Sequence, residues 1–414
     1  GRIRFKLDGE ERLYHTLFIV KKAASKPKAP IAFLCSTNSW KAYSATAFSP
    51  TWKGIKKSIG NNGFANSPGE PPAFCFYRPH RAGQGTYQMG FRVPWPIAGP
   101  YTTMGPEEWD YSHLCRQDRF LQVWLESQGY EYDVITDSDL HLDPRILDGY
   151  KTLTVVGHSE YWSFEAMEAV SQFLDGGGNA VVLSGNTAFW RVSMNEDASV
   201  IECRKGDAPG TQVRADRRGE MWHSLDGRRG GMSRECGFPA WKLFGLEYFA
   251  LMGVGWPSVG PYKAKDPDHF LFRQPIDLSL KAGDPFGGTE GNPLAQPIGH
   301  EADVRVSTLA KFLVAPPPPG GRAPVEDPAG ITLLAEGYVD PAKVGFAWDY
   351  FQRPLPPGKV PMIPVAAEMI YWERPGGGRV FHSGSINSAS TLSTNDKWAG
   401  LMQNVLSHFG VERA

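Results

Sequence analysis

Polar residues able to do chemistry stand at the ends of two predicted strands. His158 and Glu160 follow the apolar run 153–156, and Asn186 follows the apolar run 180–183. An imidazole, a carboxylate and a carboxamide at buried strand ends must either satisfy one another or take part in a reaction. From these residues alone, a structural hydrogen bond between His158 and Glu160 explains the pair as well as a catalytic role does.

The segment between these residues predicts a β-α-β unit that positions them. Residues 163–174 place apolar side chains at helical spacing between the two β-branched runs. Strands joined by such a crossover are parallel, and strands that are apolar throughout are buried on both faces. Ligands of open parallel sheets bind beyond the carboxyl ends of the strands, which is where His158 and Asn186 are expected.

The rest of the chain favours an α/β fold, with a mostly parallel sheet and flanking helices, of the class I glutamine amidotransferase-like or flavodoxin-like type. This expectation comes from the alternation of strand-like and helix-like segments along the chain. Additional strands are expected at 31–34, 131–135, 366–372 and 379–383, and additional helices at 117–128 and 397–409.

The domain organisation is expected to be uneven. Residues 1–27 alternate as strands do and then become a linker. Two strands do not make a domain, so this segment is interpreted as the remnant of a β-sandwich whose earlier part is missing from the chain, or else as an addition to the next domain. Residues 28–414 are expected to form the α/β catalytic domain. Within it, the many Pro and Gly residues of 197–361 predict a long irregular loop and β insertion.

The composition of the chain limits the kinds of partner that it is expected to bind. The chain has 414 residues, 41% of them hydrophobic, and a formal net charge of -1, which is globular and gives no electrostatic reason to bind nucleic acid or an anionic membrane. No apolar run is long enough to span a bilayer. The five cysteines are widely spaced without a C-x-x-C pair, which favours reduced thiols in a cytoplasmic protein. A small neutral substrate or a protein partner is expected.

Common catalytic motifs are absent from the sequence. It contains no G-x-S-x-G nucleophile elbow, no G-x-x-x-x-G-K-[ST] phosphate loop and no H-E-x-x-H zinc motif. His158 and Glu160 are therefore the one closely spaced imidazole and carboxylate pair at a predicted strand end.

The order of motifs over about residues 5–409 resembles the catalytic C-terminal region of the large (beta) subunit of N,N-dimethylformamidase. No single piece is specific, but the ordered series is. The pieces are WKAY at 40–43, YRPH at 77–80, GYEYDV at 129–134, HSEY at 158–161, Asn186 with Trp190, GRRGG at 227–231, GHEAD at 299–303 and the tail 383–409.

The resemblance implies a mononuclear ferric ion, Fe(III), held by Tyr43, Tyr77 and Glu160. It also implies catalytic or supporting roles for His158 and Asn186, and for Glu301. The implied reaction is hydrolysis of a small amide, with dimethylformamide giving formate and dimethylamine as the closest example. Further expectations are a small subunit as partner and assembly into a homo-oligomer. The lectin-like domain that the family carries upstream is not in this chain.

The chemistry of this set is coherent. Phenolate and carboxylate oxygens are hard anionic ligands that suit a hard trivalent cation. A free tyrosine has a pKa near ~10, so Tyr43 and Tyr77 would ionise at neutral pH only against a strong Lewis acid. Glu301 is then the candidate general base for an attacking water, while His158 and Asn186 would orient Glu160 or stabilise the oxyanion.

Other interpretations remain open from the residues themselves. Tyr43 and Tyr77 could be ordinary core tyrosines, Glu301 could be a surface charge with His300 serving in its place, and Asn186 could be a turn former. The main alternative function is a non-catalytic carbohydrate-associated or assembly domain of the same fold without a metal. Another is a hydrolase with the same site that acts on a different amide or ester.

Overall fold

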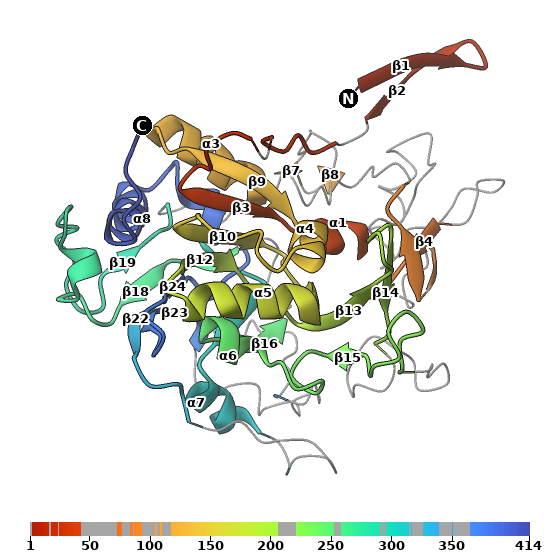
Figure 1. Ribbon diagram of the computed structural model, residues 1–414. Coiled ribbons are helices and arrows are strands. Elements are labelled where there is room, and N and C mark those ends of the chain that lie inside the picture. The colour runs from red at the N-terminus through yellow and green to blue at the C-terminus, as the bar shows by residue number, and fades with distance from the viewer. Residues whose placement is uncertain are drawn as a thin grey trace.

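The computed structural model is drawn in Figure 1, where a broad sheet runs across the molecule between helices. The residues that the structure describes are 2–15, 18–23, 25–42, 73–76, 83–85, 87–92, 104–105, 108–109, 117–205, 221–251, 258–289, 292, 295–313, 316, 326–338, 350 and 365–414.

One half of the central nine-stranded sheet is parallel. Its strands were expected from the sequence, because apolar β-branched runs buried on both faces are typical of parallel sheets. Every residue of β3, β10 and β12 is buried. The parallel strands, in spatial order, are β24 (Arg379–His382), β12 (Asn179–Ser184), β10 (Thr152–Gly157), β3 (Ile31–Cys35) and β9 (Tyr132–Thr136).

The other half is antiparallel, so the expectation of a mostly parallel sheet of the glutamine amidotransferase-like or flavodoxin-like type is wrong. The sheet is mixed, and most of the smaller sheets are antiparallel as well. One cause is the short connection 374–378 between β23 and β24, which can join only antiparallel strands. The second is that part of the range 197–361, expected to be an irregular loop and β insertion, pairs into the central sheet. The antiparallel strands are β23 (Val365–Glu373), β22 (Ile331–Tyr338), β18 (Tyr262–Ala264) and β19 (Pro285–Phe286).

Helices cover both faces of the central sheet (Figure 1). α3 (Arg119–Gln128) and α8 (Asp396–His408) pack on one face through apolar side chains such as Trp124 and Trp398. The opposite face is covered by α4 (Asp137–Leu142), α5 (Phe164–Asp175) and α6 (Ala240–Phe244). Ser163 caps α5 and Asn395 caps α8, each by accepting a backbone N–H of the first turn.

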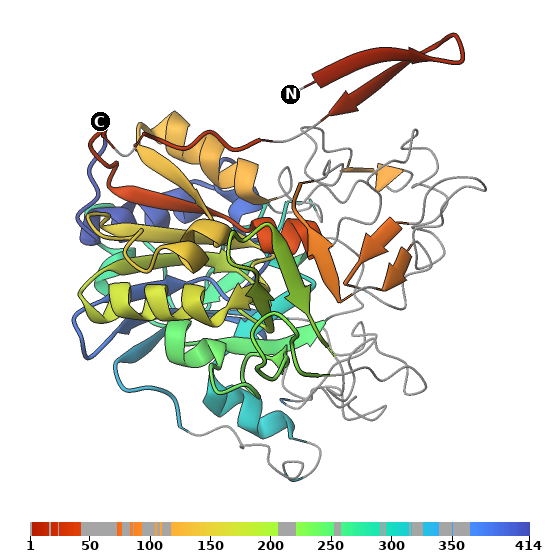
Figure 2. The same cartoon turned by 45° about the vertical axis from the view of Figure 1, so that its right-hand side comes forward.

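Smaller elements gather beyond the carboxyl ends of the parallel strands, where Figure 2 shows the strands of a second sheet standing across the end of the first. This second sheet has the order β11 (Tyr161–Ser163), β13 (Trp190–Met194), β14 (Val200–Cys203) and β6 (Gln88–Gly90), with β15 (Gly231–Met232) also paired to β13. Two more elements reach the same region: the short helix α1 (Thr37–Ala42), and β21 (Glu301–Val304) paired with β16 (Glu247–Leu251).

The first two strands form a hairpin that extends away from the rest of the protein (Figure 1). β1 (Arg2–Leu7) and β2 (Glu10–His15) are joined at Asp8 and Gly9, both with positive φ, as a tight hairpin turn requires. The remaining strands are β4 (Ala73–Cys75), β5 (Gly83–Gly85), β7 (Met104–Gly105), β8 (Glu108–Trp109), β17 (Ser258–Gly260) and β20 (Ile298–Gly299); the remaining helices are α7 (Val306–Leu309) and the 3₁₀ turns η4 (Phe270–Phe272), η5 (Ala310–Phe312) and η7 (Ser388–Thr391).

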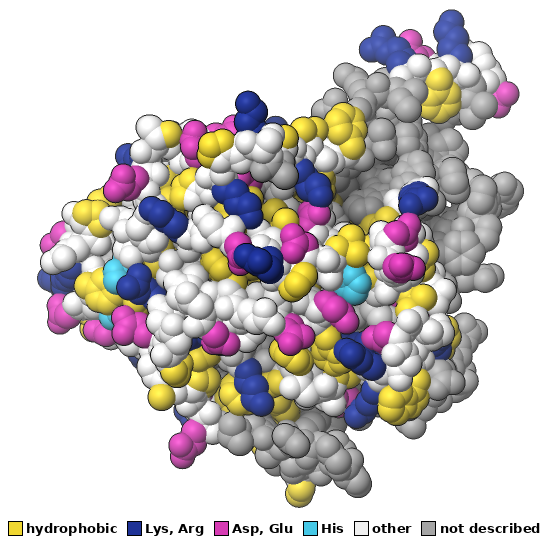
Figure 3. Space-filling view, in the orientation of Figure 1, with side chains coloured by type: hydrophobic (Ala, Val, Ile, Leu, Met, Phe, Trp, Pro, Cys, Tyr) yellow, Lys and Arg dark blue, Asp and Glu magenta, His cyan; other side chains and the backbone are white. Residues whose placement is uncertain are grey.

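The charged surface is mixed in sign. On the face shown in Figure 3, Lys and Arg side chains are interspersed with Asp and Glu side chains, in keeping with the net charge of -1. Among the helices of the described ranges, none has the length and apolar character needed to cross a membrane.

Candidate active site

A buried carboxylate fixes the helix that follows β3. Asp137 Oδ2 accepts hydrogen bonds from the backbone N–H of Asn38 (2.8 Å) and from Thr37 Oγ1 (3.1 Å). Burial raises the pKa of Asp137 to about 7, although these two bonds oppose the change. The start of α1 is therefore pinned to the carboxyl end of β9.

The same helix holds the turn after β10. The side chain of Asn38 donates to the carbonyl of Tyr161 (3.0 Å), and the N–H of Glu160 donates to Ser39 Oγ (3.0 Å). Glu160 is fully buried. Asn38 and Ser39 of α1 thus hydrogen-bond the backbone on both sides of the Glu160 side chain. These bonds hold the Glu160 carboxylate at the junction of β3 and β10. The order of the parallel strands reverses at this junction, where sheets of this kind bind ligands.

His158 lies between two carboxylates. Its Nδ1 is 2.7 Å from Glu160 Oε1 and 3.0 Å from Glu301 Oε2. Burial of the ring works against protonation, but the negative charges of Glu301 and Glu160 outweigh it and raise the pKa of His158 to about 10. The contacts with both carboxylates thus favour the imidazolium form of the ring.

Glu301 comes from β21, far along the chain, and meets the turn after β12. Asn186 Nδ2 donates to Glu301 Oε1 at 3.4 Å. Burial raises the pKa of Glu301, and Glu160 adds to this while His158 opposes it. One buried atom here, Asn186 Oδ1, has no hydrogen-bond partner among the described residues. An orphaned polar atom of this kind is expected where a ligand binds.

A glycine allows β21 to approach this turn. A Cβ atom on Gly185 would lie 2.4 Å from the carbonyl oxygen of Glu301 and 2.7 Å from the amide nitrogen of Ile386. Asn186, the next residue, has a φ of 60°, in the left-handed region. The close backbone contact brings the side chains of Asn186 and Glu301 together.

The charge of this cluster fits a cation. Glu160 and Glu301 share the single imidazolium of His158, so these three side chains carry an excess of negative charge in a buried place. Possible ligand atoms of His158, His300 and Glu301 all lie within 4.8 Å of one another. His158, His300 and Glu301 are therefore a candidate metal-binding group, in which His158 could bind a metal only in its neutral form, and the group does not fix which metal it would hold.

Four of the six predicted site residues meet in the described part of the chain: His158, Glu160, Asn186 and Glu301. Tyr43 and Tyr77 lie outside the described residues. Two residues that hold turns of this site in place, Asp303 and Asp137, were not predicted from the sequence. Asp303 could have been noticed, because alternate residues of a strand share a face and it follows Glu301 by two positions in a predicted motif.

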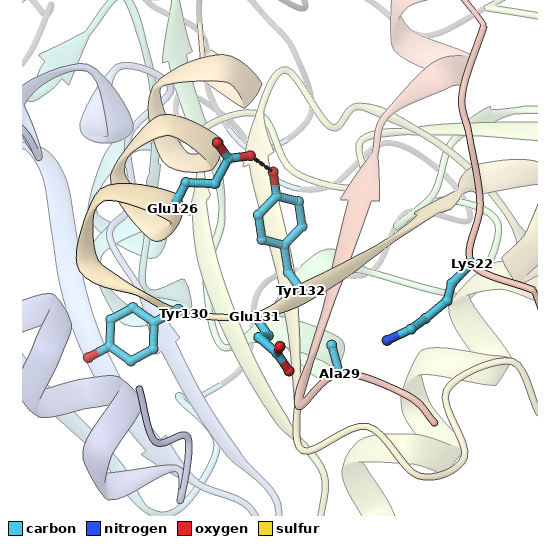
Figure 4. Close-up of a pocket in the computed structure, with 6 residues that line it drawn as sticks. All are labelled: Lys22, Ala29, Glu126, Tyr130, Glu131 and Tyr132. Carbon is cyan, nitrogen blue, oxygen red and sulfur yellow. Dashed lines mark hydrogen bonds between the residues drawn. The ribbon is translucent and has the colours of Figure 1, made fainter. Parts of the chain in front are cut away.

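Two hollows lie at the opposite, amino ends of the parallel strands. One, of about 380 Å³, is lined by Lys22, Ala29, Glu126, Tyr130, Glu131 and Tyr132, and in it Tyr132 donates a hydrogen bond to Glu126 (Figure 4). The other, of about 620 Å³, includes Lys151 and Asn179 beside the starts of β10 and β12. Neither is lined by a residue of the His158 cluster.

Comparison with known proteins finds relatives that share one name. Two curated relatives are each named N,N-dimethylformamidase beta subunit. The one from Alcaligenes sp is 28% identical over 307 residues, and the one from Paracoccus aminophilus is 26% identical over 304 residues. Each alignment covers 70% of this chain and 36% of the relative, so the chain spans about a third of the relatives' length.

The solved structures add little. A β-galactosidase from Rahnella sp. R3 superposes over 94% of this chain and 32% of its own, but with a TM-score of 0.34 and 13% identity it supports no argument.

The family model described as N,N-dimethylformamidase beta subunit-like, C-terminal, matches residues 2–400. The chain therefore belongs to the N,N-dimethylformamidase beta subunit-like, C-terminal family.

Proposed function

We propose that this chain hydrolyses the C–N bond of a small linear amide, with dimethylformamide as the model substrate and formate and dimethylamine as products. The observation that carries the proposal is the buried cluster in which His158 lies between Glu160 and Glu301, with Asn186 bonded to Glu301. Family membership supports an amide hydrolase in general. The substrate is inferred from the names of relatives that are much longer than this chain.

The cofactor proposed is a mononuclear ferric ion with Tyr43, Tyr77 and Glu160 as ligands. When bound, it would supply Lewis-acid polarisation of the amide carbonyl and acidify water. The excess negative charge of the buried Glu160 and Glu301 supports a cation here. Oxygen ligands of negative charge favour a hard trivalent ion over zinc.

Glu301 is the proposed general base. Its raised pKa and its place beside the cluster suit a carboxylate that takes a proton from water while the water oxygen attacks the carbonyl carbon. The same carboxyl group then returns this proton to the amine nitrogen as the C–N bond breaks. The imidazolium of His158 holds the Glu160 and Glu301 carboxylates in place, and Asn186 orients Glu301 from its other side.

A partner subunit and a cytoplasmic location are part of the proposal. The relatives are named as beta subunits, a name that implies a second kind of subunit in those proteins. For this chain we propose a small partner subunit and a homo-oligomeric assembly.

The test is a formate-release assay on iron-loaded protein, together with metal analysis. We expect a single iron ion per chain, formate release from dimethylformamide, and loss of activity on removal of iron that is restored by adding iron but not zinc. A protein that binds iron and hydrolyses none of a panel of small amides would contradict the proposed activity. Activity that survives complete removal of iron would contradict the proposed cofactor.

A further inference from the structure

Asp303 is a buried carboxylate next to the candidate active site that the proposed reaction does not use. It is fully buried on β21, two residues after Glu301. It accepts hydrogen bonds from the backbone N–H of Asn186 (2.7 Å), from the backbone N–H of Thr187 (3.2 Å) and from Thr187 Oγ1 (2.8 Å). A carboxylate bonded to two successive backbone amides fixes the path of the chain at that turn.

The turn that Asp303 holds is a demanding one. Asn186 is in the left-handed region with a φ of 60°, which is uncommon for non-glycine residues, although asparagine adopts it more readily than most. The side chain of this residue bonds Glu301. Successive positions i and i+2 of a strand point to the same side, so one short strand presents Glu301 to the side chain of Asn186 and Asp303 to its backbone.

Asp303 also links this turn to the neighbouring strand of the central sheet. Its Oδ2 lies 3.5 Å from Nε2 of the fully buried His382 on β24, and its own N–H donates to the carbonyl of Gly384 (2.9 Å). The residue is thus tied to both β12 and β24.

We infer that Asp303 is a positioning residue for amide hydrolysis: it holds Asn186 in the conformation that places the amide group against Glu301. The expected effect of Asp303 on kcat rests on the proposed function. Its expected effect on the conformation of the turn at Asn186 does not. A small displacement of a residue that orients a catalytic base lowers the rate of the reaction by about 10- to 100-fold.

The test uses Thr187→Val, which removes one bond to Asp303 with little change in volume, and Thr187→Ser, which keeps the hydroxyl. Thr308→Val is the matched control. Thr308 Oγ1 donates to the buried Glu368 at 2.7 Å, and this pair contributes no side chain to the site. The readouts are kcat and KM for amide hydrolysis, the iron content, and hydrogen–deuterium exchange of the peptide that contains residues 185–188.

For Thr187→Val we expect faster exchange in that peptide, a kcat reduced by about 10- to 100-fold, and unchanged KM and iron content. Thr187→Ser should restore both the exchange and kcat, and Thr308→Val should leave both as in the wild type. Wild-type exchange in Thr187→Val, or a kcat that falls no more than in Thr308→Val, would overturn the inference. If the wild type hydrolyses no amide, the proposed function fails separately, and the exchange comparison alone decides whether Asp303 holds the turn.

Discussion

The N–H of Phe76 donates a hydrogen bond of 3.2 Å to the carbonyl of Ala42. These two residues directly precede Tyr77 and Tyr43 in the sequence. The ring of Phe76 also lies against that of Tyr161, the neighbour of Glu160, with 6.0 Å between ring centroids. The chain segments that lead to the two tyrosines thus meet next to Glu160, which supports the proposed convergence of three oxygen ligands.

Glu160 and Glu301 should differ in function, with Glu160 as a metal ligand and Glu301 as the general base. Glu160→Gln removes the negative charge of a proposed ligand, so we expect loss of bound iron together with activity. Glu301→Gln should keep the iron but lose activity by about 10²- to 10⁴-fold, because a general base is removed. Metal analysis, kinetics and thermal unfolding of both variants check this. Retention of iron by Glu160→Gln, or near-normal turnover by Glu301→Gln, would contradict the assigned roles.

Gly185 should tolerate no side chain. In Gly185→Ala the new Cβ would meet backbone atoms of Glu301 and Ile386 at 2.4 and 2.7 Å, and backbone cannot move aside as a flexible side chain can. We expect a loss of about 1–3 kcal/mol in the free energy of unfolding, together with a fall in activity.

The matched control for this substitution is Gly90→Ala, because the nearest atom to its Cβ would be 3.9 Å away. Urea unfolding compares the two variants. Equal stability of Gly185→Ala and Gly90→Ala would show that β21 does not approach the turn after β12 as closely as described.

Asp137 should make stability depend on pH. Its pKa is raised from 3.8 to about 7, so the folded protein favours the protonated carboxyl, and the stability that this group contributes is lost as pH rises from about 4 to about 7. Asp137→Asn cannot ionise and keeps an acceptor for the N–H of Asn38. We therefore expect the stability of Asp137→Asn relative to wild type to increase across this interval and to stay constant above it.

Urea unfolding at intervals of pH measures this difference. Asp148→Asn, at an exposed position on the surface, serves as the control and should reproduce the wild-type pH profile. A difference between Asp137→Asn and wild type that does not change with pH would contradict the raised pKa.

The sequence predicted the half of the fold whose pattern is local. β10, α5 and β12 were expected because continuous apolar runs flank a segment of helical period, and they lie within two residues of the expected bounds. In the antiparallel half only β23 was expected as a defined strand. β22, β18 and β19 lie in a range rich in Pro and Gly, and their pairing depends on contacts distant in sequence.

Some residues of the candidate site could likewise be predicted from the sequence, and others could not. His158 and Glu160 could be placed together from their spacing, and Asn186 from its position after a parallel strand. Glu301 was implied by the resemblance alone, because four residues of β21 give too short a pattern to be recognised as a strand. The roles of Asp303 and Asp137 follow from hydrogen bonds that span about a hundred residues, which spacing along a sequence does not encode.

Resonance Raman spectroscopy of the iron-loaded protein tests the central claim most directly, because ligation by tyrosinate gives iron(III) a visible charge-transfer band whose excitation enhances phenolate ring modes. The predicted result is a coloured wild type with these modes, weakened in Tyr43→Phe and in Tyr77→Phe and unchanged in Tyr132→Phe, whose tyrosine bonds Glu126 at the other end of the sheet. Iron-loaded wild-type protein without the band, or spectra that neither Tyr43→Phe nor Tyr77→Phe alters, would contradict it.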